Sequence, residues 1–119
     1  MEEFKNRQTA TARLDMALGG LHQVATVAII AIIVFADIAT ASDSTKRLVA
    51  FIAVMTSVTS WIFTSNALTV FQSDSKDLTA AERETASGLS AAKQPWLVYQ
   101  IYVLAITVAT IVFVLTAIY

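Results

Sequence analysis

The sequence predicts an all-α integral membrane protein with three transmembrane helices in a small bundle. Two observations lead to this fold class. Hydrophobic residues make up 56% of the 119 residues and charged residues only 14%, whereas a soluble domain carries about 25% charge. Three long stretches are also apolar enough to cross ~30 Å of hydrocarbon as helices of about 20 residues. We therefore expect a single membrane domain whose apolar surface contacts lipid.

The three predicted spans cover residues 21–41, 48–71 and 95–119. The first contains one charged residue, Asp37, and the other two contain none. A helix is the expected form, because it pairs its backbone hydrogen-bonding groups internally. The motif ATA at residues 39–41 resembles a signal-peptidase site, but the acidic Glu2 and Glu3 and the interrupting Asp37 favour an uncleaved span.

The distribution of basic residues predicts the orientation. Of the eight Lys and Arg residues, six lie in residues 1–20 and 72–94, and only Lys46 and Arg47 lie between the first two spans. Cytoplasmic loops carry an excess of Lys and Arg. We therefore expect the N-terminus on the cytoplasmic side and the C-terminus on the opposite side. Trp96 and Tyr99 begin the third span and Tyr119 ends it, as expected of aromatic residues at the interfaces.

The N-terminal segment 1–20 is charged but has apolar residues at Phe4, Leu14 and Leu18. This spacing favours a short amphipathic helix on the cytoplasmic surface over a simple solvated leader. Gly19 and Gly20 would then form the bend into the first span.

The loop 72–94 is polar and is expected to contain a short helix. Thr79 and Glu82 have the spacing of a capping box, and Gly88 is a candidate C-terminal stop, so the predicted helix covers residues 80–87. The mixed charges of this cytoplasmic loop are typical of a solvated face, with a docking surface for a soluble partner as the alternative.

The second span is unusually rich in hydroxyl groups. On a helical wheel its small and hydroxyl residues share one face, which suits close helix packing better than a pore, since the span carries no ionisable group. Narrower stripes of small residues occur on the other two spans. The expected packing residues are Ala53, Thr56, Ser57, Ser60, Thr64 and Ala67 in the second span, Ala25, Ala28, Ala36 and Ala39 in the first, and Ala105, Ala109 and Thr116 in the third.

Two titratable residues of the first span are candidate functional groups. Asp37 lies near the outer interface, where it is expected to pair with Lys46 or Arg47; a proton-carrying carboxylate is the alternative. His22, the only histidine, is a weak candidate ligand for a haem or chlorophyll supplied by a complex. Asn66 and Gln100 are amides within spans and are expected to bond to neighbouring helices or partner subunits.

The composition narrows the function more than any motif does. The chain contains no cysteine and has a net charge of −1, which gives no basis for thiolate chemistry or nucleic-acid binding. It shows no catalytic or nucleotide-binding motif. We therefore expect no enzyme, no metal and no cofactor held by this chain alone, but an accessory subunit of a larger membrane complex of respiratory, photosynthetic or monooxygenase type. The alternative is a self-assembling oligomer, such as a holin-like or small channel-forming protein, and a weaker one is a small transporter using Asp37.

Overall fold

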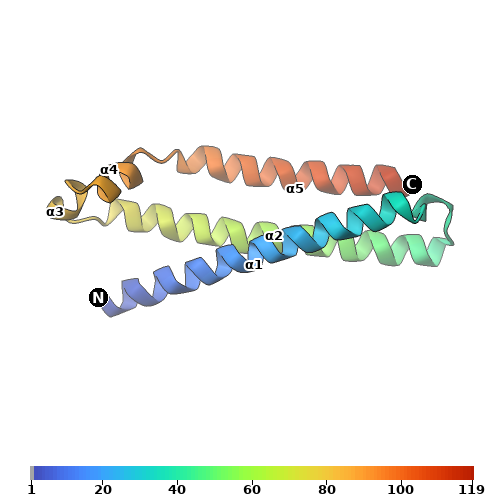
Figure 1. Ribbon diagram of the computed structural model, residues 1–119, viewed down its shortest axis with the longest axis horizontal. Coiled ribbons are helices and arrows are strands. Elements are labelled where there is room, and N and C mark those ends of the chain that lie inside the picture. The colour runs from blue at the N-terminus through green and yellow to red at the C-terminus, as the bar shows by residue number, and fades with distance from the viewer. Residues whose placement is uncertain (1) are drawn as a thin grey trace.

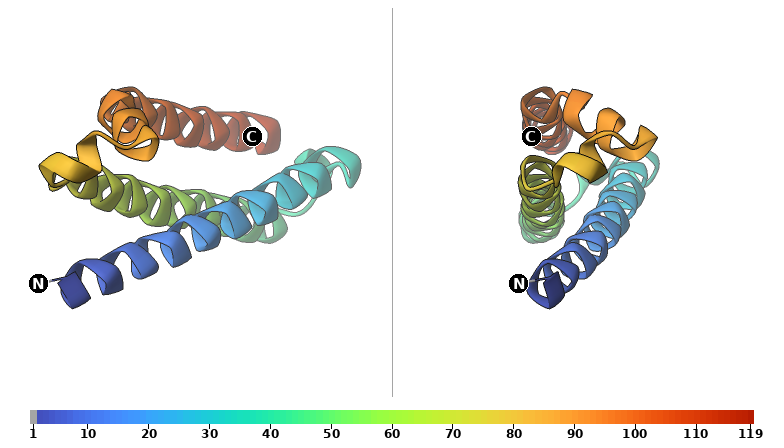
Figure 2. Two further views of the ribbon diagram at one scale, coloured as in Figure 1. Left: turned by 60° about the vertical axis from the view of Figure 1, so that its left-hand side comes forward. Right: turned by 90° about the vertical axis from the view of Figure 1, so that its left-hand side faces the viewer.

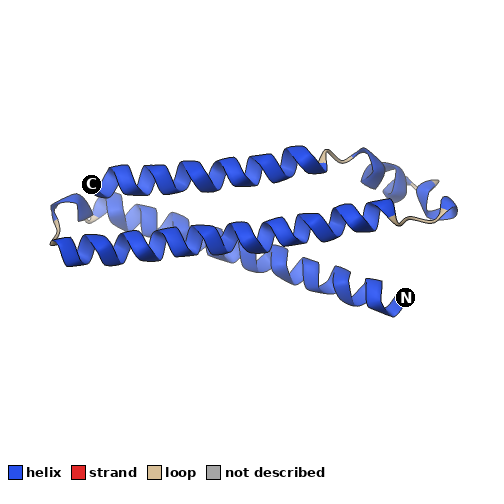
Figure 3. Cartoon of the chain, turned by 180° about the vertical axis from the view of Figure 1, so that it is seen from behind, coloured by secondary structure: helices blue, strands red, loops and turns tan. Residues whose placement is uncertain are grey.

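The computed structural model describes residues 2–119, and this part of the chain contains helices and short connections but no strand (Figure 3). Three long helices dominate it: α1 (Glu2–Phe35), α2 (Asp43–Lys76) and α5 (Trp96–Ile118). A short helix η1 (Ile38–Thr40) joins α1 to α2, and α3 (Ala80–Arg83) and α4 (Ala86–Lys93) join α2 to α5. Each long helix is long and apolar enough to cross a membrane. The predicted fold class is confirmed.

The three long helices lie along one axis of a slender molecule of 61 × 25 × 16 Å (Figure 1). α2 is central: α1 and α5 each pack against it in the antiparallel sense and make few contacts with each other (Figure 2). The hydrophobic core lies where the α1–α2 connection meets the C-terminal end of α5. Its buried residues are Ile33, Ile38, Ala50, Ala53, Val114 and Ile118.

α1 runs without interruption through Gly19 and Gly20. The expected bend and the separate surface helix over residues 1–20 are therefore wrong; Met1 of that segment lies outside the described residues. A glycine inside a helix costs about 1 kcal/mol relative to alanine but does not end the helix. Packing on α2 holds the N-terminal part in line, as Thr9 Oγ1 donates to Asp74 Oδ2 over 2.7 Å.

The two helices of the first hairpin are longer than a bilayer needs. α1 and α2 have 34 residues each, or ~51 Å at 1.5 Å per residue, against ~30 Å of hydrocarbon. Their apolar parts, roughly residues 16–35 and 48–71, overlap along the bundle, and the charged N-terminal turns of α1 lie beside the C-terminal end of α2, where Thr9 contacts Asp74. The N-terminal turns of α1 thus continue the helix in line with the rest of the bundle.

α1 ends at Phe35, six residues before the predicted end of the first span. Asp37 follows in the left-handed conformation with φ 51° and ψ 52°, which a continuing helix cannot contain. The backbone N–H and the hydroxyl of Thr40 both donate to the Asp37 carbonyl, at 3.0 and 2.9 Å. Ser42 then caps α2 by accepting the N–H of Thr45 at 3.3 Å. The connection is therefore a compact hydrogen-bonded turn.

The loop 72–94 contains two short helices where one was predicted. The capping box is confirmed: Thr79 N–H donates to Glu82 Oε2 at 2.7 Å and Glu82 N–H to Thr79 Oγ1 at 3.2 Å. The predicted stop at Gly88 is wrong, because Thr85 caps a second helix that includes Gly88 and accepts its N–H at 3.0 Å. A Cβ at Gly88 would overlap the Glu82 carbonyl, so this glycine lets α4 fold back closely on α3.

Candidate functional site

The packing between α1 and α2 follows a regular spacing on both helices. The buried residues of α1 are seven apart, and a buried set on α2 has intervals of three, four, three and seven; they are Ala12, Gly19, Thr26 and Ile33 on α1 and Ala50, Ala53, Ser57, Ser60 and Ala67 on α2. Spacing of this kind is the heptad pattern of helices that pack along one seam. All these residues except Ile33 are small, so the two backbones approach closely.

Gly19 marks the closest approach of α1 to α2. A Cβ built there would overlap Thr64 Oγ1 and lie 3.2 Å from the Ser60 carbonyl oxygen, whereas one at Gly20 would meet nothing within 4 Å. Ser60 Oγ donates to the Gly19 carbonyl at 2.7 Å, and this bond is buried. The absence of a side chain at Gly19 and the hydroxyl of Ser60 therefore join the start of the apolar part of α1 to the middle of that of α2.

The structure places the predicted packing residues of the second span mostly inside the bundle. Ala53, Ser57, Ser60 and Ala67 are buried, and Thr56 and Thr64 are half-buried. The stripes expected on the other spans are exposed: Ala25, Ala28, Ala36 and Ala39 in the first, and Ala105, Ala109 and Thr116 in the third. These stripes therefore do not pack the helices of this chain against one another, and they remain open to lipid or to a partner helix. Contact with α2 follows the heptad faces instead, through residues such as Thr26, Thr107 and Val114.

Most threonine hydroxyls within the spans bond to their own helix. Each donates to a carbonyl four residues earlier, at 2.6–2.9 Å, in the pairs Thr26 to His22, Thr56 to Ile52, Thr69 to Ser65, Thr107 to Val103 and Thr116 to Val112. This local bond lets a hydroxyl reside in lipid without a second helix. The hydroxyl content of the second span is therefore compatible with a membrane helix and does not require a water-filled pore.

Gln100 joins α2 to α5 toward the end of the bundle that carries α3 and α4. Its amide oxygen accepts from Ser65 Oγ at 2.8 Å, and its amide nitrogen donates to the Ser65 carbonyl at 3.1 Å and to Thr69 Oγ1 at 3.2 Å. Both ends of the amide are paired, as expected for a polar group in a span. The expectation that Gln100 bonds to a neighbouring helix is confirmed.

A cavity of about 260 Å³ lies where α1, α2 and α5 meet. Met16, Gly19, Gly20 and Gln23 line it from α1, Ser60 and Thr64 from α2, and Val103, Ile106 and Thr107 from α5. It exists because α1 and α5 both contact α2 but diverge from each other (Figure 2). Its lining is mainly apolar with a few hydroxyls and one amide, so it suits a lipid chain or a side chain of another helix.

His22 contacts two parts of the bundle. Its Nδ1 lies 2.7 Å from the Leu18 carbonyl oxygen, which can only accept, so Nδ1–H is the donor. The ring lies 5.6 Å from that of Phe63 on α2, centroid to centroid. These contacts orient the imidazole within the α1–α2 packing; its role as a ligand for a cofactor stays a prediction.

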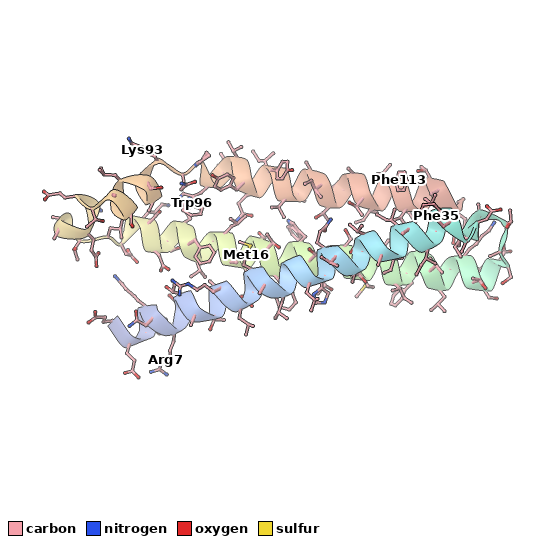
Figure 4. All side chains as sticks on the ribbon, in the orientation of Figure 1. Arg7, Met16, Phe35, Lys93, Trp96 and Phe113 are labelled. Carbon is pink, nitrogen blue, oxygen red and sulfur yellow. The ribbon has the colours of Figure 1, made fainter. Side chains whose placement is uncertain are left out.

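The charged residues form few contacts. Asp37 is exposed, and its carboxylate accepts a bond of 3.3 Å from Thr40 Oγ1. The expected pair with Lys46 or Arg47 does not form, since the only ion pair in residues 2–119 joins Arg7 and Glu3 at 3.1 Å near the N-terminus, where Figure 4 labels Arg7. Within the same residues no group of three or more His, Asp or Glu side chains is placed to hold a metal ion.

Sequence reasoning missed Gly19 as the closest contact of the bundle and Gln23 as a lining residue of the cavity. The signal was present in α1: residues 12, 19, 26 and 33 recur at intervals of seven, and three of the four are small or hydroxyl-bearing. A wheel at 100° per residue favours the alanine stripe instead, since it does not follow a heptad repeat over several turns.

The comparisons with known proteins add no family. No protein-family model matches the chain, and no curated protein or solved structure matches it. What the protein does must therefore be argued from the arrangement of its own residues.

Proposed function

We propose that this protein is a non-catalytic accessory subunit of a larger integral membrane complex, of respiratory, photosynthetic or monooxygenase type. It contributes helices that pack against other subunits and leaves the chemistry to them. The charge distribution supports an N-terminus on the cytoplasmic side and a C-terminus on the opposite side, with six basic residues on the inner side against two on the outer.

The observation that carries this proposal is the exposure of the small-residue faces of α1 and α5. Ala105 and Ala109 lie on the side of α5 away from the buried Thr107 and Val114. Ala25, Ala28 and Ala36 likewise lie away from the buried face of α1. Small side chains let a further helix approach closely. Since the chain does not cover these faces itself, helices of other subunits are their expected partners.

The test is purification of the tagged full-length protein from its native membrane in a mild detergent, followed by mass spectrometry. We expect foreign membrane subunits in stoichiometric amounts. The double substitution Ala105→Leu and Ala109→Leu should reduce their recovery at least tenfold, because leucine holds a neighbouring helix away. Val108→Leu, on another exposed side of α5, is the matched control and should retain them. Recovery of the chain without any foreign subunit contradicts the proposal.

A second candidate is a self-assembling membrane oligomer, such as a holin-like or small channel-forming protein. The observation that favours it is the exposed amide of Asn66 on α2, which can pair with an identical amide. For this candidate, the same purification should yield multiples of this chain alone.

A further inference from the structure

One face of α2 contacts neither α1 nor α5. It carries Leu48, Ile52, Met55, Thr59, Ile62, Asn66 and Ser73, which we call the outer α2 face. All of these residues are exposed except Thr59, which is half-buried. The face lies roughly opposite the buried Ala50, Ser57 and Ser60, and Figure 3 shows α2 in front of the other helices with one side uncovered.

The residues of the outer α2 face follow a heptad pattern. From Leu48 to Asn66 their intervals are four, three, four, three and four residues. This spacing keeps a stripe on one side of a helix and matches a partner helix that crosses it at about 20°. The face therefore has the geometry of a second packing seam, separate from the one that α1 occupies.

Asn66 is the polar group of this seam and has no hydrogen-bond partner within residues 2–119. It lies about six residues from the middle of the apolar part of α2, or ~9 Å from the midplane, inside the ~15 Å half-thickness of the hydrocarbon. An amide unpaired at this depth costs free energy, because lipid chains offer no donor or acceptor. Gln100, the other amide deep in the spans of α2 and α5, is paired at both its oxygen and its nitrogen. A donor and an acceptor from another chain would satisfy this amide.

We propose that the outer α2 face binds the same face of a second copy of this protein, with the two Asn66 amides hydrogen-bonded to each other. Copies inserted in the same direction have parallel α2 helices, and a two-fold axis along the membrane normal brings each residue opposite its equivalent. An amide both donates and accepts, so it is complementary to its own copy. A single Asn in an otherwise mainly apolar seam fixes the register of such a pair.

This inference does not rest on the proposed function, because the faces concerned are different. Foreign subunits are proposed to bind the alanine faces of α1 and α5, whereas the second copy binds α2. A dimer without foreign subunits would contradict the proposed function alone, and foreign subunits without a dimer would contradict the present inference alone.

The first test uses the absence of native cysteine. The full-length variants Met55→Cys and Ile62→Cys, on the outer α2 face, are oxidised in membranes with copper phenanthroline. Both should form disulfide-linked dimers at least tenfold more than Val108→Cys on α5. All three positions are exposed, so the substitutions leave the bundle intact. Equal cross-linking at the three positions, or cross-linking of Ile62→Cys to a different protein, overturns the inference.

The second test removes the amide. Dimerisation of the labelled full-length protein is followed by energy transfer in liposomes of phosphatidylcholine as the protein-to-lipid ratio is varied. Asn66→Leu should weaken the dimer about 3- to 30-fold, the range expected from one interhelical amide bond of about 0.6–2 kcal/mol. Asn66→Gln, which keeps the amide, should retain most of the affinity. An Asn66→Leu variant that dimerises as well as the wild type overturns the inference.

Discussion

At the scale of single residues, Gly19 sets the distance between α1 and α2, and its neighbour Gly20 faces open space. Two adjacent residues of one type thus have different roles, which only their position on the helix distinguishes. The contact at Gly19 combines close packing with the buried bond from Ser60. Interhelical hydrogen bonds in membranes contribute about 0.6 kcal/mol on average, so packing is the larger part of this contact.

The glycine pair provides a direct test of that packing. Gly19→Ala should lower the stability of the bundle by about 1–3 kcal/mol, because the added methyl group overlaps Thr64 and crowds the Ser60 carbonyl. Gly20→Ala should leave stability unchanged or raise it by up to about 1 kcal/mol, since alanine favours the helix and has room. The measurement is unfolding in detergent by titration with dodecyl sulfate, followed by circular dichroism. Equal effects of the two substitutions would contradict the role given to Gly19.

Asp37 is the second residue whose type is explained by its position, because its backbone conformation favours only a few residue types. It is the only non-glycine residue with positive φ in residues 2–119, and Asn, Asp and Gly adopt this conformation most readily. The backbone conformation therefore explains why an acidic residue lies at the end of a span, and proton transport is not needed to explain it.

Substitutions at Asp37 should therefore follow conformation and not charge. Asp37→Asn and Asp37→Gly should keep the wild-type stability, whereas Asp37→Val should lower it by about 1–2 kcal/mol. The same detergent titration measures these differences. If Asp37→Asn is instead as destabilised as Asp37→Val, the carboxylate charge matters and the transporter alternative gains support.

At the scale of elements, the short helix α3 depends on its capping box. The backbone N–H of Thr79, together with its hydroxyl, holds the pKa of Glu82 below the ordinary 4.5. A carboxylate whose pKa is lower in the folded state than in the unfolded state stabilises the folded state at pH values above the unfolded-state pKa. This stabilisation is lost as the pH falls through the folded-state pKa. α3 should therefore be intact at neutral pH and lose its cap only at pH below about 4.5.

The pKa of Glu82 can be measured by carboxyl-carbon nuclear magnetic resonance in micelles. It should lie below 4.5 in the wild-type protein and rise toward that value in Thr79→Gly, which removes the hydroxyl and loosens the turn. Thr85→Gly, at the cap of α4, is the control and should leave it unchanged. A Glu82 pKa at or above 4.5 in the wild type contradicts the capping geometry.

Some elements of this protein can be predicted from its sequence and others cannot, and the reasons are physical. The three spans follow from apolar length alone, and the Thr79–Glu82 cap follows from a local motif. The path of the chain through Gly19 and Gly20 does not, because glycine is compatible with both a bend and a close helix contact. Contact with α2, about 40 residues later in the sequence, is what favours the straight helix over the bend. The alanine faces of α1 and α5 show the same ambiguity: alanine suits an inner or an outer face, and only the packing of the bundle leaves these faces exposed.

At the scale of the whole molecule, the bundle has a hydrophobic core at one end, a cavity between its three long helices and an uncovered face on each of those helices. α2 is packed on two sides, whereas α1 and α5 contact the rest of the chain mainly through α2. Many large apolar side chains remain exposed along all three helices, such as Val24 at 68%, Phe51 at 63% and Ile101 at 59%. In water such a surface would cause aggregation, so lipid and partner helices are its expected surroundings.

The central claim is that α1, α2 and α5 each cross the bilayer, with the N-terminus inside. Single cysteines at Gln8 in the N-terminal part of α1, Ser44 in the first turn of α2 and Ser87 in α4 can be labelled in intact cells with a membrane-impermeant maleimide. We expect Ser44→Cys to react from outside, and Gln8→Cys and Ser87→Cys to react only after the membrane is opened. Labelling of Gln8→Cys and Ser44→Cys from the same side would show that α1 does not cross, and would contradict the account.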